Sequence, residues 1–465
     1  MIPPRLEAAL APASPSRQLA ALFGASGHEL YLVGGSVRDA LLDRPNADLD
    51  FATDATPDVI EEIVRPWAGD VYVAGKRFGT IGVIREGNIY EITTFRSEVY
   101  RDDSRKPEVV FSESIEEDLF RRDFTSNAMG IGIPGRDQGT PEMIDPTGGL
   151  GDLQAGLLRT PLDPEVSFGD DPLRMLRLFR FVSTLGFAPS EEAVAAVHRM
   201  HDRLDIVSAE RIRGEFDRLI VGDDVGTALV GLVATGLAGE FIQELPALAL
   251  ESDPIHHHKD VLTHTIAVVE KTSPRLRLRL AALFHDVGKP ETREFGPGGV
   301  SFHHHEVVGA RMTRRKMTEL RYRKSVVDDV SRLVFLHMRP HTYKMGWTDS
   351  AVRRYVRDAG PLLEDLDELV RSDVTTRNAK RARAIANRID ELEQRIEELG
   401  QREELDAMRP PIDGNQVMDY LGLESGPRIG EIMDMLLERR IDDGPYSEKE
   451  AFALLDSWAG EGSGS

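Results

Sequence analysis

The chain has 465 residues, no cysteine and a formal net charge of −22, from 57 basic and 79 acidic residues. This length exceeds one ordinary core and predicts about three domains. The lack of cysteine excludes disulfides and thiolate zinc sites and favours a reducing, cytoplasmic location. The acidic total argues against a protein that coats nucleic acid through its overall field, although a local basic track remains open. No apolar stretch approaches the ~20 residues of a membrane helix, and no signal-peptide pattern follows the N-terminus.

Residues 20–150 predict a mixed α/β head, because short apolar or alternating runs are separated by glycine and proline. The expected strands are Leu30–Val33, Leu49–Ala52, Val71–Val73, Ile81–Ile84, Tyr90–Phe95, Val109–Phe111 and Met143–Ile144. From about residue 165 the periodicity becomes helical, and Pro164 and Pro172 mark expected helix starts. The predicted fold class is therefore α+β, with an N-terminal mixed sheet followed by all-α regions.

Four regions are expected along the chain: a head at 20–150, a helical neck at 151–250, a histidine-rich region at 251–378 and a helical tail at 379–460. In the tail, the charged helix 383–408 carries apolar residues spaced four and three apart, namely Ile385, Ile389, Leu392, Ile396 and Leu399. This seam predicts packing against a neighbouring helix, with a dimeric coiled coil as the alternative.

The head contains Gly34-Gly35-Ser36-Val37-Arg38-Asp39, followed by Asp48-Leu49-Asp50. A Gly-Gly turn after an apolar strand lets backbone N–H groups approach a phosphate. Asp48 and Asp50, two apart in an extended segment, are expected to point to one face. Paired carboxylates suit Mg²⁺ that also holds a triphosphate, so both are predicted to be catalytic metal ligands. Glu91, on the alternating strand 90–95, is the candidate third catalytic carboxylate.

These motifs resemble the catalytic motif of class II tRNA nucleotidyltransferases, the CCA-adding enzymes, and of the bacterial poly(A) polymerases related to them. Residues 121–128 are similar to the family's Arg-Arg-Asp-Phe-Thr-x-Asn-Ala element, and residues 170–174 to its Glu-Asp-x-x-Arg template, with Asp170 in place of Glu. A later neck motif matches at 210–215. The resemblance implies a polymerase-β-like nucleotidyltransferase head, with tRNA as partner, CTP and ATP as substrates and Mg²⁺ as cofactor.

The resemblance also implies roles for single residues. Asp171 and Arg174 would select the base of CTP or ATP. The spacing of three predicts one polar helical stripe that continues through Arg177 and Arg180 toward the triphosphate. Phosphate or ribose contacts fall to the glycine turn and two arginines, namely Gly34, Gly35, Arg38 and Arg122. The polar segment 95–107 corresponds to a loop that helps the family switch from C to A addition, which favours CCA or A addition here.

Most of the 13 histidines lie between residues 256 and 341. The set His264, His285-Asp286 and Asp373 offers imidazole and carboxylate ligands for a metal. Residues 283–290 resemble the central motif of the HD phosphohydrolases, and His305 and His337 could furnish a second metal. A metal-bound water could then attack a phosphoester; the alternative is a degenerate domain that only docks tRNA. The metal at this site is predicted to be divalent, with its identity open.

The helical segment 310–324 contains seven basic residues and one acid, and could either follow RNA phosphates or form a solvated face. The leading hypothesis is a CCA-adding tRNA nucleotidyltransferase with a possible second phosphohydrolase site. A poly(A) polymerase is the first alternative. A phosphohydrolase whose head only binds nucleotide is the alternative from another class. The tail is predicted to bind tRNA or to pack, no membrane partner is expected, and the oligomeric state stays open.

Overall fold

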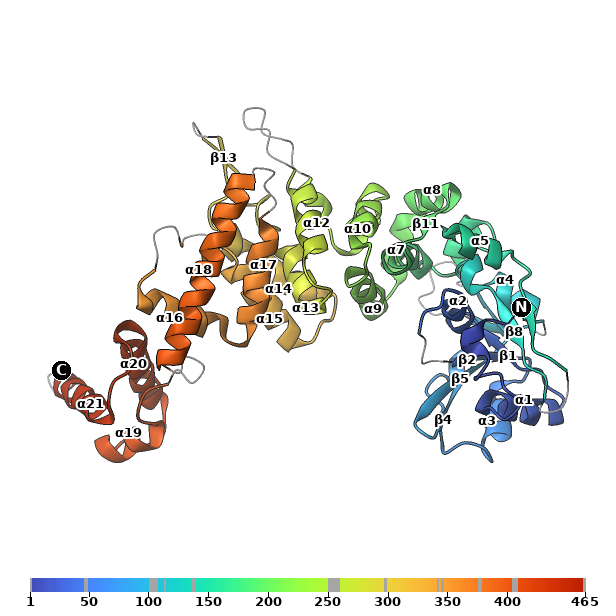
Figure 1. The fold of residues 1–465 in the computed structure, drawn as a ribbon, viewed down its shortest axis with the longest axis horizontal. Helices are drawn as coiled ribbons and strands as arrows, with labels where there is room; N and C mark the ends of the chain where they lie inside the picture. Colours follow the sequence, from blue (N-terminus) through green and yellow to red (C-terminus); the bar gives the residue numbers. More distant parts are fainter. Residues whose placement is uncertain are drawn as a thin grey trace. The chain divides into compact units, whose positions relative to one another are not determined.

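The computed structural model describes the chain except residues 1, 46–48, 100–107, 113, 136–138, 250–259, 297–298, 341–342, 344–346, 375–378, 404–408 and 463–465. It divides into two compact units, one of residues 1–246 with 319–321, the other of residues 247–318 with 322–465. Figure 1 shows the large sheet in the N-terminal part of the chain and mainly helices, with a few short strands, in the rest, which confirms the α+β class. The finer division into four regions stays a prediction.

The head is built on a seven-stranded mixed sheet of order β3-β4-β5-β2-β1-β8-β9. The strands are β1 (Tyr31–Val33), β2 (Leu49–Thr53), β3 (Asp70–Tyr72), β4 (Thr80–Arg85), β5 (Asn88–Thr94), β8 (Gly130–Gly132) and β9 (Glu142–Ile144). β2 and β5 run parallel, whereas the other neighbouring pairs are antiparallel. A separate antiparallel ribbon joins β6 (Arg96–Val99) to β7 (Glu108–Phe111).

All seven expected strands are present, but β6 and β8 were not predicted. β8 is hard to recognise because two of its three residues are glycine, which weakens a strand pattern. The sheet itself explains these glycines: a Cβ on Gly132 would lie 3.4 Å from the ring of Tyr31 on the neighbouring strand. The strand forms because β1 and β9 pair with it on either side.

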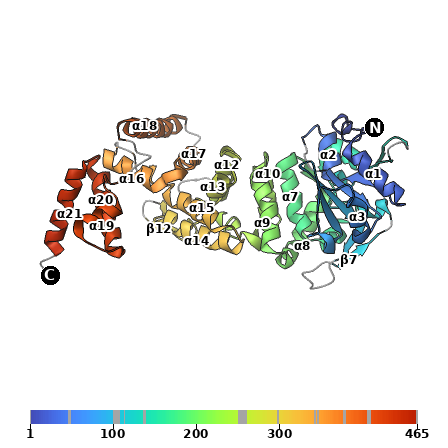
Figure 2. The same cartoon turned by 90° about the horizontal axis from the view of Figure 1, so that it is seen from below.

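One face of the sheet forms the core of the head. Phe51, Ile92, Ile81 and Val83 are almost fully buried there, and α3 (Pro57–Val64) packs against β4 and β5, with α1 (Pro15–Ala25) beside it (Figure 2). Because side chains alternate along a strand, Asp50 and Glu91 lie on the opposite face, outside this core.

Three helices of the first unit pack against α7 (Leu173–Leu185), namely α6 (Pro164–Asp170), α9 (Ala209–Ile220) and α10 (Val225–Ala234). Both predicted helix starts are confirmed: Asp163 accepts the N–H of Glu165 at the start of α6, and Pro172 immediately precedes α7. The remaining helices of this unit are α2 (Gly35–Leu41), α4 (Ile115–Phe120), α5 (Gly149–Ala155), α8 (Glu191–Met200) and α11 (Ala238–Phe241).

The prediction that Asp171 shares one helix with Arg174, Arg177 and Arg180 is wrong. Asp171 has extended backbone angles (φ −145°, ψ 101°) and lies in the turn between α6 and α7. The residue before a proline is disfavoured in the α region, and Pro172 follows Asp171 directly. Only the three arginines of the stripe lie on α7.

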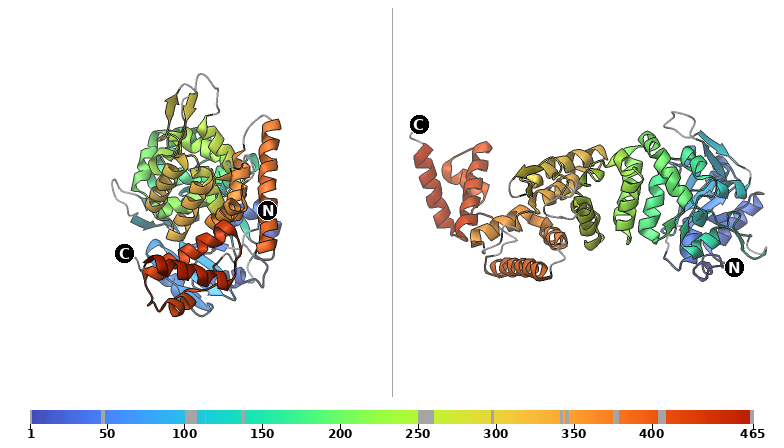
Figure 3. Two further views of the ribbon diagram at one scale, coloured as in Figure 1. Left: turned by 90° about the vertical axis from the view of Figure 1, so that its left-hand side faces the viewer. Right: turned by 90° about the horizontal axis from the view of Figure 1, so that it is seen from above.

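The second unit is helical apart from a small hairpin of β12 (Glu294–Gly296) and β13 (Gly299–Ser301). Its helices are α12 (Val261–Lys271), α13 (Leu276–Phe284), α14 (His305–Glu319), α15 (Lys324–Leu336), α16 (Asp349–Ala359), α17 (Leu363–Asp373), α18 (Ala379–Glu403), α19 (Gly414–Leu421), α20 (Pro427–Asp443) and α21 (Glu448–Gly462). The helix α18 packs against α16 and α17 and buries Ile389, Leu392 and Leu399, which confirms packing on neighbouring helices. The last three helices enclose their own small core (Figure 3). None of the described helices has the length and hydrophobicity of a membrane span.

Candidate functional site

Two of the three predicted catalytic carboxylates lie side by side on the face of the head sheet opposite Phe51 and Ile92. Asp50 on β2 and Glu91 on β5 are direct partners in the parallel ladder, so their side chains project from the same face. Asp50 is partly buried and Glu91 is exposed. The N–H of Asp50 donates to the buried hydroxyl of Ser36 at 3.1 Å, which ties the carboxylate strand to the glycine turn. Asp48 lies outside the described residues.

The glycine turn holds an arginine at close range. Gly34 has φ +71°, and a Cβ there would lie only 2.7 Å from Nη1 of Arg122. Its N–H donates to the carbonyl of Met129 at 3.2 Å, while Gly35 begins α2. Arg122 is also bound by Asp118 through two N–H groups, at 3.0 and 3.2 Å. The turn therefore needs glycine for its backbone conformation, and a side chain there would also displace the guanidinium beside it.

A chain of hydrogen bonds leads from the glycine turn to α7. Arg38, which is 9% exposed, donates to Oδ1 of Asn127 at 2.6 Å, and the amide of Asn127 donates to Oδ1 of Asp123 at 2.9 Å. Arg177 on α7 donates to the other oxygen of Asp123 at 2.5 and 2.9 Å. Residues from the glycine turn, the Arg121–Ala128 element and α7 thus form one polar network.

Electrostatics keep this network charged. Burial alone would raise the pKa of Asp123, but the charge of Arg177 and the hydrogen bonds from Asn127 and Arg177 hold it well below its usual value. Glu215 on α9 forms ion pairs with Arg177 at 3.2 Å and Arg180 at 2.8 Å. Burial and the neighbouring charge of Arg177 lower the pKa of Arg180 to about 10. The guanidinium of Arg180 also lies over the Phe181 ring, 3.9 Å from its centroid.

The predicted base-selecting pair is held by protein groups. Asp171 is 8% exposed; its Oδ1 accepts the N–H of Leu173 at 3.1 Å and its Oδ2 accepts Nη2 of Arg211 at 2.9 Å. Arg174 donates to Ser167 Oγ at 2.9 Å and to the carbonyl of Arg121 at 2.6 Å. Base selection, and nucleotide contact by Arg177 and Arg180, stay predictions, since these side chains are engaged with the protein here.

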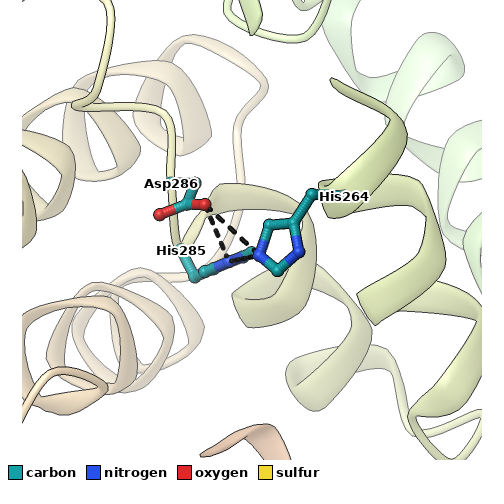
Figure 4. A group of neighbouring side chains, drawn as sticks. All are labelled: His264, His285 and Asp286. Atoms are coloured by element: carbon teal, nitrogen blue, oxygen red, sulfur yellow. Dashed lines mark hydrogen bonds and ion pairs between the residues drawn. The ribbon is translucent and has the colours of Figure 1, made fainter. Parts of the chain in front are cut away.

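The predicted metal ligands of the second unit converge from five helical segments, namely α12, the end of α13, α14, the end of α15 and α17. Nε2 of His264 on α12 lies 3.3 Å from Nε2 of His285, 3.5 Å from Oδ2 of Asp286 and 2.9 Å from Oδ1 of Asp373 on α17. Figure 4 shows the first three side chains pointing toward one another. His305 and His337 approach Asp286 to form a second group of potential ligands, so Asp286 belongs to both groups. His256, His257 and His258 lie outside the described residues.

Three of the histidines are oriented as metal-bound histidines are. His285, His305 and His337 each use Nδ1 to bond a backbone carbonyl, that of Ala282, Phe302 and Val334, at 2.6 to 2.8 Å. This bond fixes the tautomer and directs Nε2 toward the cluster. Nε2 of His305 is buried and has no hydrogen-bond partner among the described residues. Imidazole nitrogens and carboxylate oxygens in this arrangement fit a divalent metal.

The charged groups of the cluster shift one another's pKa values. Burial alone would lower the pKa of His285, but Asp286 and Asp373 raise it to about 10, whereas burial and the charge of His285 lower the pKa of His337 to about 3. Lys289 donates to Oδ2 of Asp286 at 2.6 Å, a contact that was not predicted although Lys289 lies within the 283–290 motif. Lys289 follows Asp286 by three residues, and this spacing was the signal that could have predicted the contact.

The basic segment 310–324 does not present all its charges to solvent. Lys316 is 4% exposed, and Arg314 is bound to Asp328 on α15. The expectation that every basic side chain there could follow RNA phosphates is wrong for Lys316, because a buried ammonium group cannot reach a backbone outside the fold.

Family models match three parts of the chain: a poly A polymerase head domain at residues 30–159, a probable RNA and SrmB-binding site of polymerase A at 186–248, and an HD domain at 255–394. The chain is 34% identical to an A-adding tRNA nucleotidyltransferase of Deinococcus radiodurans over 446 residues, covering 93% of this chain and 96% of that protein. It is 39% identical to a CCA-adding enzyme of Anoxybacillus flavithermus over 260 residues, 56% of this chain and 61% of that enzyme.

The match to a CCA-adding enzyme of Bacillus pumilus likewise covers only 52% of that enzyme's length, at 42% identity over 48% of this chain. Among solved structures, a Bacillus stearothermophilus CCA-adding enzyme in complex with CTP resembles the chain with a TM-score of 0.68 and 24% identity, covering 98% of both chains. At that identity the likeness concerns the fold. The near full-length relative, the matched domains and the shared fold together place the chain in the tRNA nucleotidyltransferase and poly(A) polymerase family that carries an HD domain.

Proposed function

We propose that this protein is a CCA-adding tRNA nucleotidyltransferase, which extends the tRNA 3′ end with CTP and ATP. The observation that carries the proposal is the in-register pair Asp50 and Glu91, tied through Ser36 to a glycine turn that holds Arg122. Family membership adds support, because solved relatives are a CCA-adding enzyme with CTP and a tRNA nucleotidyltransferase with primer tRNA and an ATP analogue.

In the proposed reaction the tRNA 3′-hydroxyl oxygen bonds to the α-phosphorus of the nucleotide, and the bond to the departing pyrophosphate breaks. Mg²⁺ held by Asp48 and Asp50 would neutralise charge on the triphosphate and on the entering and leaving oxygens. Glu91, next to Asp50, would face the attacking hydroxyl and accept its proton. Arg122 and Arg38 lie beside the glycine turn and would bind nucleotide phosphate or ribose.

Selection of the base would fall to Asp171 and Arg174, an acceptor and a donor at the junction of α6 and α7. Each would have to exchange a present partner, Arg211 or Ser167, for the edge of the incoming base. Such an exchange makes the choice of nucleotide a property of the protein, with no nucleic-acid template.

The proposal is tested by incubating tRNA that lacks CCA with CTP and ATP. Three defined additions are expected, and an open-ended A ladder would indicate a poly(A) polymerase instead. Asp50→Ala should lose incorporation, whereas Glu62→Ala, an exposed carboxylate on α3 of the same head, should retain it. No incorporation by the wild type would favour a phosphohydrolase whose head only binds nucleotide.

One observation favours a second candidate, addition of A alone. The relative matched over 96% of its length is named an A-adding enzyme, whereas two relatives named CCA-adding are matched over 61% and 52% of theirs. Separate substrates distinguish the two: a CCA enzyme adds C to tRNA lacking CCA when given CTP alone. An A-adding enzyme extends only tRNA that already ends in CC, when given ATP.

We further propose that the HD cluster is a second, metal-dependent phosphohydrolase site. His264, His285, Asp286 and Asp373 would hold a divalent metal, and His305 with His337 a second; the metal would supply an activated water for attack on a phosphoester. The orientation of three imidazoles by backbone carbonyls supports this. Asp286→Ala should abolish hydrolysis of a 2′,3′-cyclic phosphate while tRNA extension continues. Absence of any hydrolysis by the wild type with Mn²⁺, Ni²⁺ or Mg²⁺ would favour a domain that only docks tRNA.

A cytoplasmic location for both activities is proposed from the lack of cysteine.

A further inference from the structure

Four strands of the head sheet place a tyrosine in line with the proposed catalytic carboxylates. The ladders pair Tyr72 on β3 with Gly82 on β4, Gly82 with Glu91 on β5, and Glu91 with Asp50 on β2. Directly paired residues project from the same face of a sheet. These four positions therefore form one row across the sheet, and the row ends at Asp50.

The glycine in this row makes room for the tyrosine ring. A Cβ on Gly82 would lie 1.9 Å from Cζ of Tyr72 and 2.1 and 2.4 Å from its two Cε atoms. The ring therefore lies directly over the Gly82 backbone, in space that any other residue would fill. Glycine inside a strand weakens it and often marks such a close approach. The three atoms nearest to such a Cβ all belong to this ring.

The ring reaches across β4 to the proposed third carboxylate. The hydroxyl of Tyr72 donates to Oε1 of Glu91 at 3.0 Å. Glu91 is exposed, and a glutamate on a surface strand otherwise has several rotamers of similar energy. Tyr72 has only two side-chain torsions, and contact with Gly82 restricts its ring. The hydroxyl is thus a well-placed donor on a flexible carboxylate.

We infer that Tyr72 is a positioning residue for nucleotidyl transfer, which holds the carboxylate of Glu91 in the orientation that faces the attacking 3′-hydroxyl. This inference rests on the proposed function and deepens it, since it acts through the same carboxylate. Glu91 needs one oxygen for the reaction, and the hydrogen bond from Tyr72 occupies the other. Gly82 contributes by leaving the path across β4 open.

The test compares single-nucleotide addition by the wild type, Tyr72→Phe, Glu91→Gln and the double variant. Tyr72→Phe keeps the ring over Gly82 and removes only the hydroxyl, so melting temperature and the KM for CTP should stay unchanged. The loss of one positioning hydrogen bond should lower kcat about 5- to 10-fold. In the Glu91→Gln background, where the carboxylate is absent, the same change should lower kcat less than about 2-fold.

Gly82→Ala provides a second test, because the added methyl group would displace the ring. It should lower kcat at least as much as Tyr72→Phe, and adding Tyr72→Phe to it should have little further effect. A wild-type kcat in Tyr72→Phe while Glu91→Gln is impaired would overturn the inference, as would equal effects of Tyr72→Phe with and without Glu91. Full activity of Glu91→Gln would instead refute the assignment of Glu91, and no incorporation by the wild type would refute the proposed function.

Discussion

The ion pair between Asp123 and Arg177 should stabilise the junction between the head sheet and α7. In Asp123→Asn the Oδ1 position keeps its donors, the N–H of Phe124 and the amide of Asn127, both at 2.9 Å. The amide nitrogen of the new side chain then replaces Oδ2 and faces the N–H groups of Arg177. Two donors meet where a charged acceptor stood, so the substitution should be clearly destabilising.

The size of the effect follows from exposure. The side chains of Asp123 and Arg177 are 9% and 30% exposed. Losing one partner costs about 3–5 kcal/mol for a fully buried pair and about 0–1 kcal/mol for an exposed one. Because Arg177 keeps Glu215 at 3.2 Å, we expect a coupling free energy of about 2 kcal/mol in a cycle with Arg177→Met and the double variant.

Native-state hydrogen exchange measured by mass spectrometry resolves this cost locally, since a multidomain chain does not unfold in one step. A loss of about 2 kcal/mol should speed exchange in peptides from 173–185 about 30-fold. Glu165→Gln is the control, because its pair with Arg199 is more than half exposed on both sides. A coupling near zero, or an equal change in the control, would refute the assigned role of the pair.

Three further experiments test other parts of the structure. Gly34→Ala places a Cβ at φ +71° and 2.7 Å from a guanidinium, so it should weaken CTP binding measured by calorimetry. Gly24→Ala, whose Cβ would have nothing within 4 Å, should not weaken it. Equal affinities of the two variants would contradict the close approach at Gly34. Asp286→Ala should remove Mn²⁺ from both ligand groups in elemental analysis and His305→Ala from only one; equal losses would show that the groups do not bind separately. Burial raises the pKa of Asp367 to about 6, so its ionisation should destabilise the fold as pH rises from about 4 to 6. Asp367→Asn should therefore gain about 1–2 kcal/mol of stability above pH 6 and none below about pH 4; a gain independent of pH, measured by thermal unfolding, would disprove this.

Local chemistry made much of the first unit predictable. Proline positions announced the starts of α6 and α7, and alternating hydrophobicity located β5 and placed Glu91 on the face away from the core. The same local rules fail where a neighbouring strand or residue determines the backbone conformation. β8 consists largely of glycine and exists because adjacent strands complete its hydrogen bonds, and Asp171 left the helical stripe because of the proline after it.

Partners far apart in the chain were predicted only where a motif marked them, and other such partners were missed. Arg177 appeared as one of three evenly spaced arginines, and nothing in its spacing pointed to Asp123, 54 residues away. Nothing in the sequence around Tyr72 indicated a role, because only the sheet register places it across Gly82 from Glu91. Such contacts depend on strand order, which short-range patterns do not encode.

What the sequence by itself determined is which chemical groups the chain offers and in what order: carboxylates after a Gly-Gly turn, three evenly spaced arginines, and histidines with aspartates in HD order. Residue type and short spacing suffice there, because they define which ligands and donors one strand, turn or helix can present. The tertiary structure alone decided how those groups are held. Ladder register set Glu91 beside Asp50, and helix packing brought Asp286 into two groups of ligands. Both depend on burial of distant apolar faces against each other, which is a property of the folded chain as a whole.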